Sequence, residues 1–316
     1  MTEQLRANGS LRHLLTLEGL SKSQIEALLT RAQKFAKPVG EPPVQKKSLA
    51  GVTVANMFTE PSTRTRVSFE LAAKRLGADV VNLEVQLSSR VKGESMLDTI
   101  YTLEACHVDV FVIRDAESGV PDLVASHVKP HVSVLSAGEA HVSHPTQGLL
   151  DALTIRQCKG DLAGLSVAIV GDIARSRVAR SAHRALATLG VPDIRIVAPR
   201  AMMPDAADFE GSRRFQSMDE GIAGADVVMM LRIQHERAGG GPVDIEAYHR
   251  AFGLTGARLA RSAPKAIVMH PGPMNRGVEI DPDVADGPQS VIRRQVANGV
   301  AVRMAVLERL AVARAT

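Results

Sequence analysis

Residues 52–77 read VTVANMFTEPSTRTRVSFELAAKRLG, and this stretch decides the fold class. The apolar run 52–58 is short and is followed by turn residues, which predicts a buried strand. The segment 63–76 predicts a helix, which Gly77 ends. A buried strand joined to a helix by a short polar turn is the repeating unit of a parallel α/β sheet.

The same alternation continues on both sides of this stretch, so we expect an α/β protein with two doubly wound parallel-sheet domains linked by interdomain helices. The length of 316 residues agrees with about two domains. We expect residues 1–150 and 151–288 to form them, and 289–316 to form a C-terminal helix, broken near Gly299, that packs back on the first domain. Further strands are predicted at 80–83, 108–113, 132–135, 166–170, 194–197, 225–231 and 266–269, and further helices at 21–36, 96–106, 121–128, 144–160 and 176–189.

Composition argues against several classes of partner. Aromatic residues make up 3% and Trp is absent, which disfavours a base-stacking surface for nucleic acid, and the net charge of +4 is spread out rather than gathered in a stripe. No apolar stretch of membrane-spanning length and no secretory signal occur, so we expect a cytoplasmic protein. Cys106 and Cys158 are predicted to be buried apolar residues, and the absence of CxxC and HExxH predicts no metal site; no cofactor is expected.

The turn between the first strand and its helix carries anion-binding chemistry. Backbone N–H groups and the dipole at a helix start favour a negative ligand. Ser62, Thr63 and Thr65 add hydroxyl donors, and Arg64 adds a permanent forked cation. The GxxxxGK[ST] pattern of a P-loop is absent. The alternative is that Ser and Thr only cap the helix, which does not account for the arginine between them.

Four segments together resemble the aspartate/ornithine carbamoyltransferase family. Residues 58–70, FTEPSTRTRVSFE, are similar to its carbamoyl-phosphate signature, 144–147 (HPTQ) and 270–273 (HPGP) to two further motifs, and 88–94 (SSRVKGE) to its mobile catalytic loop. Their order and spacing match over nearly the whole chain. The chain is therefore identified as a member of this family.

The resemblance implies a site for carbamoyl phosphate. Arg64, Thr65, Lys92, Arg114 and His144 take the catalytic positions. By the resemblance, the phosphate binds to the 62–65 turn and Arg114, and the carbonyl oxygen lies near Thr65 and His144. The carbamoyl NH₂ lies near Gln147 and the backbone of 271–273, where the peptide bond before Pro273 is expected to be cis. The full set for this substrate is Ser62, Thr63, Arg64, Thr65, Ser88, Arg114, His144, Gln147, Pro271, Gly272 and Pro273.

The amino acid that accepts the carbamoyl group is a question of charge. Aspartate presents two carboxylates, which require cations, and Arg177, Arg232, Gln234 and Lys92 match the family's positions for binding it. Ornithine enzymes typically carry a cysteine in the last motif, whereas this chain has HPGP. We therefore expect L-aspartate as the acceptor, in an early step of pyrimidine biosynthesis.

Three alternatives stay open at this point. The chain can be an ornithine or N-acetylornithine carbamoyltransferase, or a silent homologue that serves as an assembly subunit. A nucleotide-binding enzyme is the third, although residues 171–176 (GDIARS) lack the GxGxxG glycines. By resemblance, Ser88 and Lys92 belong to a neighbouring subunit's site, which implies a homotrimer with shared active sites. A larger assembly with regulatory or dihydroorotase-like chains is also compatible with the family.

Overall fold

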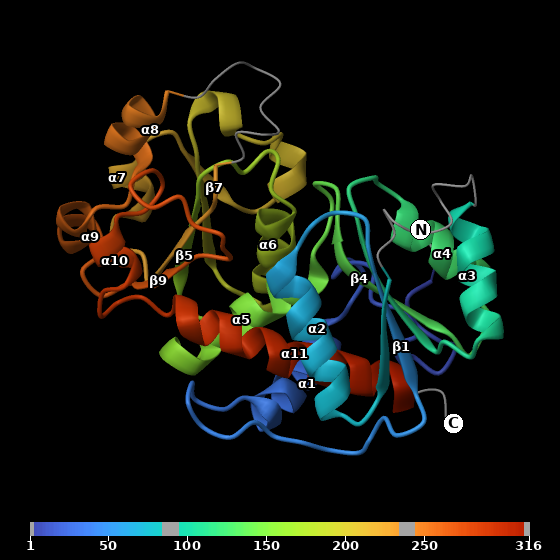
Figure 1. The fold of residues 1–316 in the computed structure, drawn as a ribbon. Coiled ribbons are helices and arrows are strands. Elements are labelled where there is room, and N and C mark those ends of the chain that lie inside the picture. The colour runs from blue at the N-terminus through green and yellow to red at the C-terminus, as the bar shows by residue number, and fades with distance from the viewer. Residues whose placement is uncertain (1–2, 84–94, 234–243, 313–316) are drawn as a thin grey trace. The chain divides into compact units, whose positions relative to one another are not determined.

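The computed structural model describes residues 3–83, 95–233 and 244–312, which form two compact units (Figure 1). The first comprises Met1–Leu149 with Ala297–Thr316, and the second Leu150–Val296. Each unit contains one parallel sheet, with strand order β2-β1-β3-β4 in the first and β7-β6-β5-β8-β9 in the second. The predicted fold class is confirmed.

The first unit alternates strands and helices as the hydrophobic pattern predicts. Ser21 begins the first helix with the expected capping box, in which its side chain accepts from the Gln24 backbone and the Gln24 side chain accepts in return. The elements are α1 (Lys22–Phe35), β1 (Thr53–Phe58), α2 (Thr63–Arg75), β2 (Asp79–Leu83), α3 (Met96–Ala105), β3 (Val110–Asp115), α4 (Val120–His127) and β4 (Ser133–Glu139).

Helices cover both faces of the first sheet. Alternate side chains such as Met57 and Phe111 pack with α3 and α4 in one buried cluster. On the other face, α2 packs on β1 and β2, and the Arg303 guanidinium of α11 (Ile292–Val312) lies 4.8 Å from the centre of the Phe69 ring of α2. A sheet buried on both faces explains why β1 and β3 read as continuous apolar runs.

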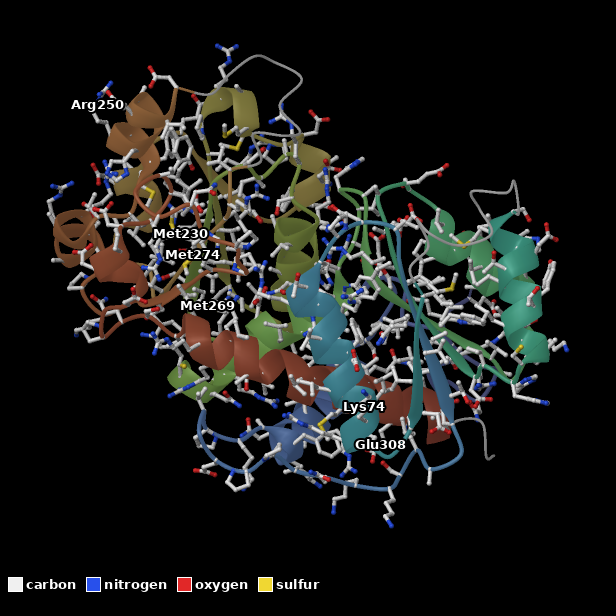
Figure 2. The ribbon with its side chains drawn as sticks, in the orientation of Figure 1. Lys74, Met230, Arg250, Met269, Met274 and Glu308 are labelled. Atoms are coloured by element: carbon white, nitrogen blue, oxygen red, sulfur yellow. The ribbon has the colours of Figure 1, made fainter. Side chains whose placement is uncertain are left out.

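The second unit has the same alternation. Its elements are β5 (Ser166–Val170), α6 (Arg177–Leu189), β6 (Asp193–Val197), η3 (Arg200–Met202), η4 (Ala206–Phe209), β7 (Arg213–Phe215), α7 (Met218–Ile222), β8 (Val227–Met230), α8 (Ile245–Phe252), α9 (Gly256–Ser262), β9 (Ile267–Met269) and α10 (Pro282–Ala285). Met230 and Met269, on adjacent strands, are fully buried, and Met274 lies in the segment after β9 (Figure 2). The sequence pattern did not predict β7 or α7–α10.

Two helices have residues in both units, as is expected of helices that link two domains. These are α5 (Pro145–Lys159) and α11, which the boundaries cut after Leu149 and after Val296. The predicted break in the last helix is wrong, because α11 continues through Gly299. Glycine costs about 1 kcal/mol in a helix interior, and here the residue is buried, so packing outweighs propensity.

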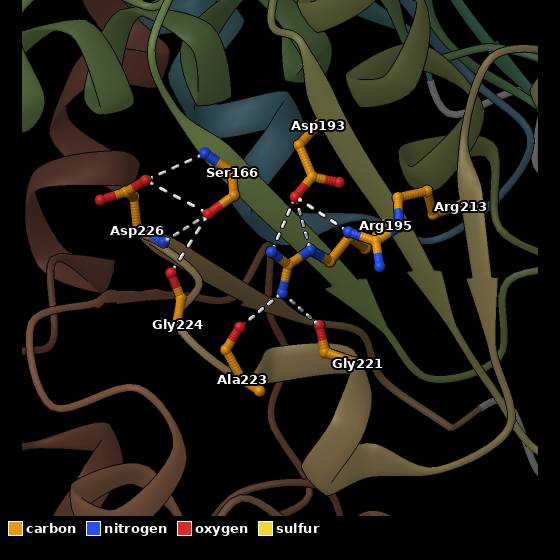
Figure 3. A network of polar contacts seen from close by, with 8 residues as sticks. All are labelled: Ser166, Asp193, Arg195, Arg213, Gly221, Ala223, Gly224 and Asp226. Atoms are coloured by element: carbon orange, nitrogen blue, oxygen red, sulfur yellow. Dashed lines mark hydrogen bonds and ion pairs between the residues drawn. The ribbon is translucent and has the colours of Figure 1, made fainter.

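Near the amino ends of the strands in the second sheet, polar groups form hydrogen bonds and an ion pair with one another (Figure 3). The Asp226 carboxylate accepts from the backbone N–H of Ser166 at 2.9 Å and from its hydroxyl at 3.2 Å. Arg195 pairs with Asp193 at 2.7 Å and donates to the carbonyls of Gly221 and Ala223. These interactions hold the loops between strands in place, and they involve none of the predicted site residues.

Both cysteines are free thiols, and the prediction that they are buried was wrong. Cys106 is exposed at the C-cap of α3, and Cys158 is half-buried with its sulfur 3.1 Å from an Arg294 guanidinium nitrogen. Among the described residues, no helix is long and apolar enough to cross a membrane.

Candidate active site

In both sheets, several of the predicted site residues follow the strands at which the strand order reverses. The chain moves from β1 outward to β2 and then returns to the other side of β1 for β3, and it does the same with β5, β6 and β8. Crossover helices leave such a point on opposite faces and open a crevice at the carboxyl ends of the strands, where α/β proteins bind ligands. Residues 62–65 and Arg114 lie after β1 and at the end of β3, and Arg177 and Arg232 follow β5 and β8.

The turn between β1 and α2 carries the predicted anion-binding residues, and its N-cap side chain does not cap the helix. Ser62 is the N-cap of α2, with φ −159° and ψ 87°, but its side chain makes no capping hydrogen bond. The first turn of α2 has no acidic residue, Thr63 and Arg64 are exposed, and Thr65 is buried. Since the hydroxyl of Ser62 does not cap the helix, the simple capping interpretation does not explain it, and the helix start keeps its positive partial charge.

Arg114 lies directly beside this turn. Parallel pairing of β1 with β3 places Phe58 opposite Arg114, and the Thr59 N–H donates to the Arg114 carbonyl at 3.0 Å. The guanidinium is held by the Glu60 carboxylate at 3.2 Å and by the Ala137 carbonyl at 3.3 Å. Glu60 was not among the predicted site residues, although it lies inside the quoted motif and contacts one of them. This ion pair limits the directions in which the Arg114 guanidinium can point.

His144 and Gln147 follow β4, the next strand along. The chain reverses tightly after β4, with the Glu139 N–H donating to the Ser143 carbonyl at 2.9 Å and Ala140 at φ +41°. His144 and Gln147 are both buried, and the Gln147 N–H donates to the His144 carbonyl at 2.9 Å. Burial raises the pKa of Glu139, even though it accepts a hydrogen bond from the Gly119 backbone.

In the second unit, three predicted segments follow adjacent strands. Arg177 begins α6 and is buried, with Ser176 capping the helix through a 3.1 Å bond from Ala179 N–H. Arg232 is half-buried two residues after β8, and residues 270–273 follow β9. The Gly272–Pro273 peptide bond is cis, as predicted. The order β5-β8-β9 therefore brings all three segments to one edge of one sheet.

Gly171 permits the close approach of the segments after β5 and β8. Its φ is +133°, and a Cβ there would lie 2.9 Å from the Leu231 carbonyl oxygen. The next residue, Asp172, is buried after β5, and that burial raises the pKa of its carboxyl group against the opposing effect of Arg175, 3.3 Å away. Asp172 was not among the predicted site residues.

Ser88, Lys92 and Gln234 lie outside the described residues, so their roles stay predictions. Within the described ranges, no group of His, Cys, Asp and Glu side chains could hold a metal ion. A cavity of about 450 Å³ in the first unit is lined by the N-terminal segment, α1 and α11, and it includes none of the predicted site residues.

The chain belongs to the aspartate/ornithine carbamoyltransferase family. Residues 12–157 match the family's carbamoyl-P binding domain, and residues 163–310 match its Asp/Orn binding domain. It is accordingly a carbamoyltransferase that uses carbamoyl phosphate and an amino acid as substrates. This agrees with the family resemblance of the four sequence motifs.

Solved structures with similar folds include both acceptor types. Aspartate transcarbamoylase from Trypanosoma cruzi in complex with carbamoyl aspartate and phosphate is 32% identical, with a TM-score of 0.85 and 95% of each chain covered. The same enzyme with N-(phosphonacetyl)-L-aspartic acid is 31% identical, with a TM-score of 0.85 and coverage of 97% of this chain and 98% of that one. Ornithine carbamoyltransferase from Thermus thermophilus is 26% identical, with a TM-score of 0.83 and coverage of 95% and 98%.

Proposed function

We propose that this carbamoyltransferase transfers the carbamoyl group from carbamoyl phosphate to the α-amine of L-aspartate, giving N-carbamoyl-L-aspartate and phosphate. The observation that carries this proposal is the pair Arg177 and Arg232, which follow neighbouring strands β5 and β8. L-Aspartate brings two carboxylates, each of which an arginine can bind through two parallel hydrogen bonds. The amine at the end of an ornithine side chain would meet a like charge instead. The reaction is an early step of pyrimidine biosynthesis.

The comparisons and the last motif support aspartate over ornithine. The aspartate transcarbamoylases of T. cruzi are 32% and 31% identical in the complexes described, against 26% for the ornithine enzyme. Residues 270–273 contain no cysteine in this chain.

The mechanism that we propose needs no covalent enzyme intermediate. The aspartate amine attacks the carbonyl carbon of carbamoyl phosphate and a tetrahedral intermediate forms. The bond from that carbon to the phosphate oxygen then breaks, and the proton that the amine loses leaves on the phosphate. Residues 62–65 and Arg114 bind the phosphate, with Arg64 on the leaving oxygen. Thr65 and His144 donate to the carbonyl oxygen as its negative charge grows. Gln147 and the backbone carbonyls of 271–272 accept from the carbamoyl NH₂.

The substrate choice is tested with the purified chain, carbamoyl phosphate and either L-aspartate or L-ornithine. We expect carbamoyl aspartate. Carbamoyl ornithine as the product would refute the role given to Arg177 and Arg232. No product from either acceptor would favour the silent-homologue alternative or a required partner chain, and the mass of the native assembly separates these two.

Removing a donor to the reacting group should slow the reaction without unfolding the protein. We expect Arg64→Ala and His144→Ala each to lower kcat by about 10²–10³-fold, as the loss of one oxyanion donor does. Arg66→Ala is the matched control, because Arg66 is an exposed arginine of the same helix turn to which no role is given. Near-normal turnover in either site variant would contradict the assignment.

We further propose a homotrimer in which Ser88 and Lys92 complete the site of a neighbouring subunit. Lys92→Ala and Arg64→Ala should each be inactive alone, and mixing them should restore partial activity because some interfaces then hold one intact site. Absence of rescue after verified subunit exchange would refute the shared site.

A further inference from the structure

The segment after β9 is held by a buried histidine and a buried glutamate. His270 and Glu279 are both fully buried. The Gly272 N–H donates to His270 Nδ1 at 2.8 Å, and His270 Nε2 lies 3.2 Å from Glu279 Oε1. A backbone N–H can only donate, so Nδ1 must be the acceptor nitrogen, and the ring proton is on Nε2, where it bonds to the carboxylate.

The same glutamate oxygen binds the far end of the segment. The Asn275 N–H donates to Glu279 Oε1 at 2.6 Å, and the Asn275 side chain donates to the Ile233 carbonyl at 3.4 Å. At the near end, the His270 N–H donates to Gln295 Oε1 at 3.0 Å, and Gln295 donates to Asp151 at 2.7 Å. The segment is therefore anchored at residues 270, 272 and 275.

Peptide geometry connects these anchors to a carbonyl at the proposed site. The Pro271 carbonyl and the Gly272 N–H belong to one peptide group, and in a planar trans peptide the two point in opposite directions. Fixing the N–H on His270 Nδ1 therefore fixes the direction of the Pro271 carbonyl. Gly272 has φ +64°, and because glycine has no Cβ, other backbone conformations are open to it if the imidazole does not hold this peptide group.

Burying a carboxylate here is costly, which argues that its geometry is needed. The second oxygen of Glu279, Oε2, is buried and has no hydrogen-bond partner within the described residues, and the same holds for the hydroxyl of Tyr248. Apolar side chains would fill this volume at lower cost, because buried pairs of this kind add little stability compared with packed apolar groups.

We propose that His270 and Glu279 are positioning residues for the carbamoyl group. Glu279 orients the imidazole, and the imidazole aims the Pro271 carbonyl at the carbamoyl NH₂. This inference rests on the proposed function, which gives that carbonyl its role, but it is the same for an aspartate and an ornithine acceptor because both reactions use the same donor.

Two substitutions at His270 separate its two hydrogen bonds. His270→Asn keeps an acceptor near the position of Nδ1 and removes the donor to Glu279, whereas His270→Gln keeps a donor near Nε2 and removes the acceptor for Gly272. We expect His270→Gln to lower kcat/KM for carbamoyl phosphate by about 10²-fold, the effect of a misplaced contact, and His270→Asn by less than about 10-fold. Glu279→Gln retains the accepting oxygen and should remain within about 10-fold of the native enzyme, whereas Glu279→Leu should resemble His270→Gln.

Inorganic phosphate gives a readout that general damage to the fold would not reproduce. It has no amide, so its inhibition constant should stay unchanged in His270→Gln while the affinity for carbamoyl phosphate falls. Equal losses for both ligands, or equal effects of the Asn and Gln variants, would overturn the proposal. Circular dichroism and thermal unfolding establish that each variant is folded.

Nitrogen-15 NMR of the native protein tests the arrangement without relying on any variant's activity. The His270 ring should be the neutral Nε2–H tautomer, and a proton on Nδ1 would overturn the proposal even if His270→Gln did not fold. If the native enzyme carbamoylated neither acceptor, the proposed function would fail. The tautomer and the ratio of carbamoyl phosphate to phosphate binding would still decide the positioning role.

Discussion

The buried side chain of His13 should make the first unit sensitive to acid. His13 is fully buried, and its Nδ1 accepts the Val134 N–H at 2.9 Å, where the N-terminal segment pairs with β4. The pKa of His13 is lowered to about 3, mainly by burial; the nearby charges of Arg12 and Arg6 act in the same direction, and Asp122 opposes them. Protonation would break the bond to Val134 and leave a buried charge.

The direction and size of the effect follow from the two pKa values. Above pH about 6.5 the histidine is neutral in both the folded and the unfolded chain, so it costs nothing. As the pH falls below 6.5, only the unfolded chain binds the proton, and stability is lost progressively until the pH reaches the folded pKa. At about 1.4 kcal/mol per unit, His13 should lower the free energy of unfolding by about 2 kcal/mol between pH 7 and pH 5.

The substitution His13→Asn tests this value, because the amide oxygen can accept the Val134 N–H but does not titrate. Urea unfolding of both proteins is followed by far-ultraviolet circular dichroism at pH 7, 6 and 5, since the chain has no Trp for fluorescence. The native protein should lose about 2 kcal/mol more than the variant over this range. His131→Asn, at an exposed position beside β4, is the control and should follow the native protein. Parallel losses in the native protein and His13→Asn would refute the reasoning.

Two further substitutions distinguish the two ends of the second sheet. Gly171→Ala should destabilise the protein by about 1–3 kcal/mol in thermal unfolding and raise KM for the acceptor amino acid, because the new Cβ strains the backbone and displaces Leu231, next to Arg232. Unchanged stability and KM would contradict the close approach. Asp226→Ala should cost about 1–3 kcal/mol by removing the acceptor for Ser166, with kcat and KM unaffected. A changed KM would show that the amino ends of the strands also influence the site.

The sequence was sufficient for the strands that are buried on both faces. Residues 53–58 and 166–170 are short apolar runs between turn signals, and each forms a central strand. The pattern failed where elements are short or half-exposed. β7 has only three residues, two of them exposed arginines, so it carries no hydrophobic signal and depends on pairing with β6.

Within the site, the sequence indicated residues that carry charge but not those that orient them. Arg64 could be chosen because an anion requires a cation after a buried strand, and Arg114 because the family resemblance implies a phosphate contact there. Glu60 and Glu279 act through contacts with Arg114 and His270, and no local pattern distinguishes such glutamates from surface ones. Cys106 shows a different limit: its burial was predicted from the average preference of cysteine, but the residue is exposed at the C-cap of α3.

Both sheets contain the same interaction between an aspartate and the first N–H of a central strand, and its position bears on where the two substrates are proposed to bind. Asp109 immediately precedes β3, and Asp226 immediately precedes β8. Their carboxylates accept the first N–H of the neighbouring central strand, from Thr53 of β1 and Ser166 of β5 respectively, each at 2.9 Å. In both sheets, the two strands joined in this way (β1 with β3, and β5 with β8) are the ones between which the strand order reverses. The arginines proposed to bind substrate lie at or after the carboxyl ends of these strands.

The residues at the amino ends of each pair of strands thus hold the sheet together, whereas the residues after the carboxyl ends can change without loss of these bonds. In the proposed assignment, the first pair carries the phosphate residues and the second carries the acceptor arginines. A change of acceptor then requires new residues only after β5, β8 and β9, while the sheet and the donor residues stay as they are. This accounts in physical terms for a family in which a carbamoyl-P binding domain is joined to an Asp/Orn binding domain.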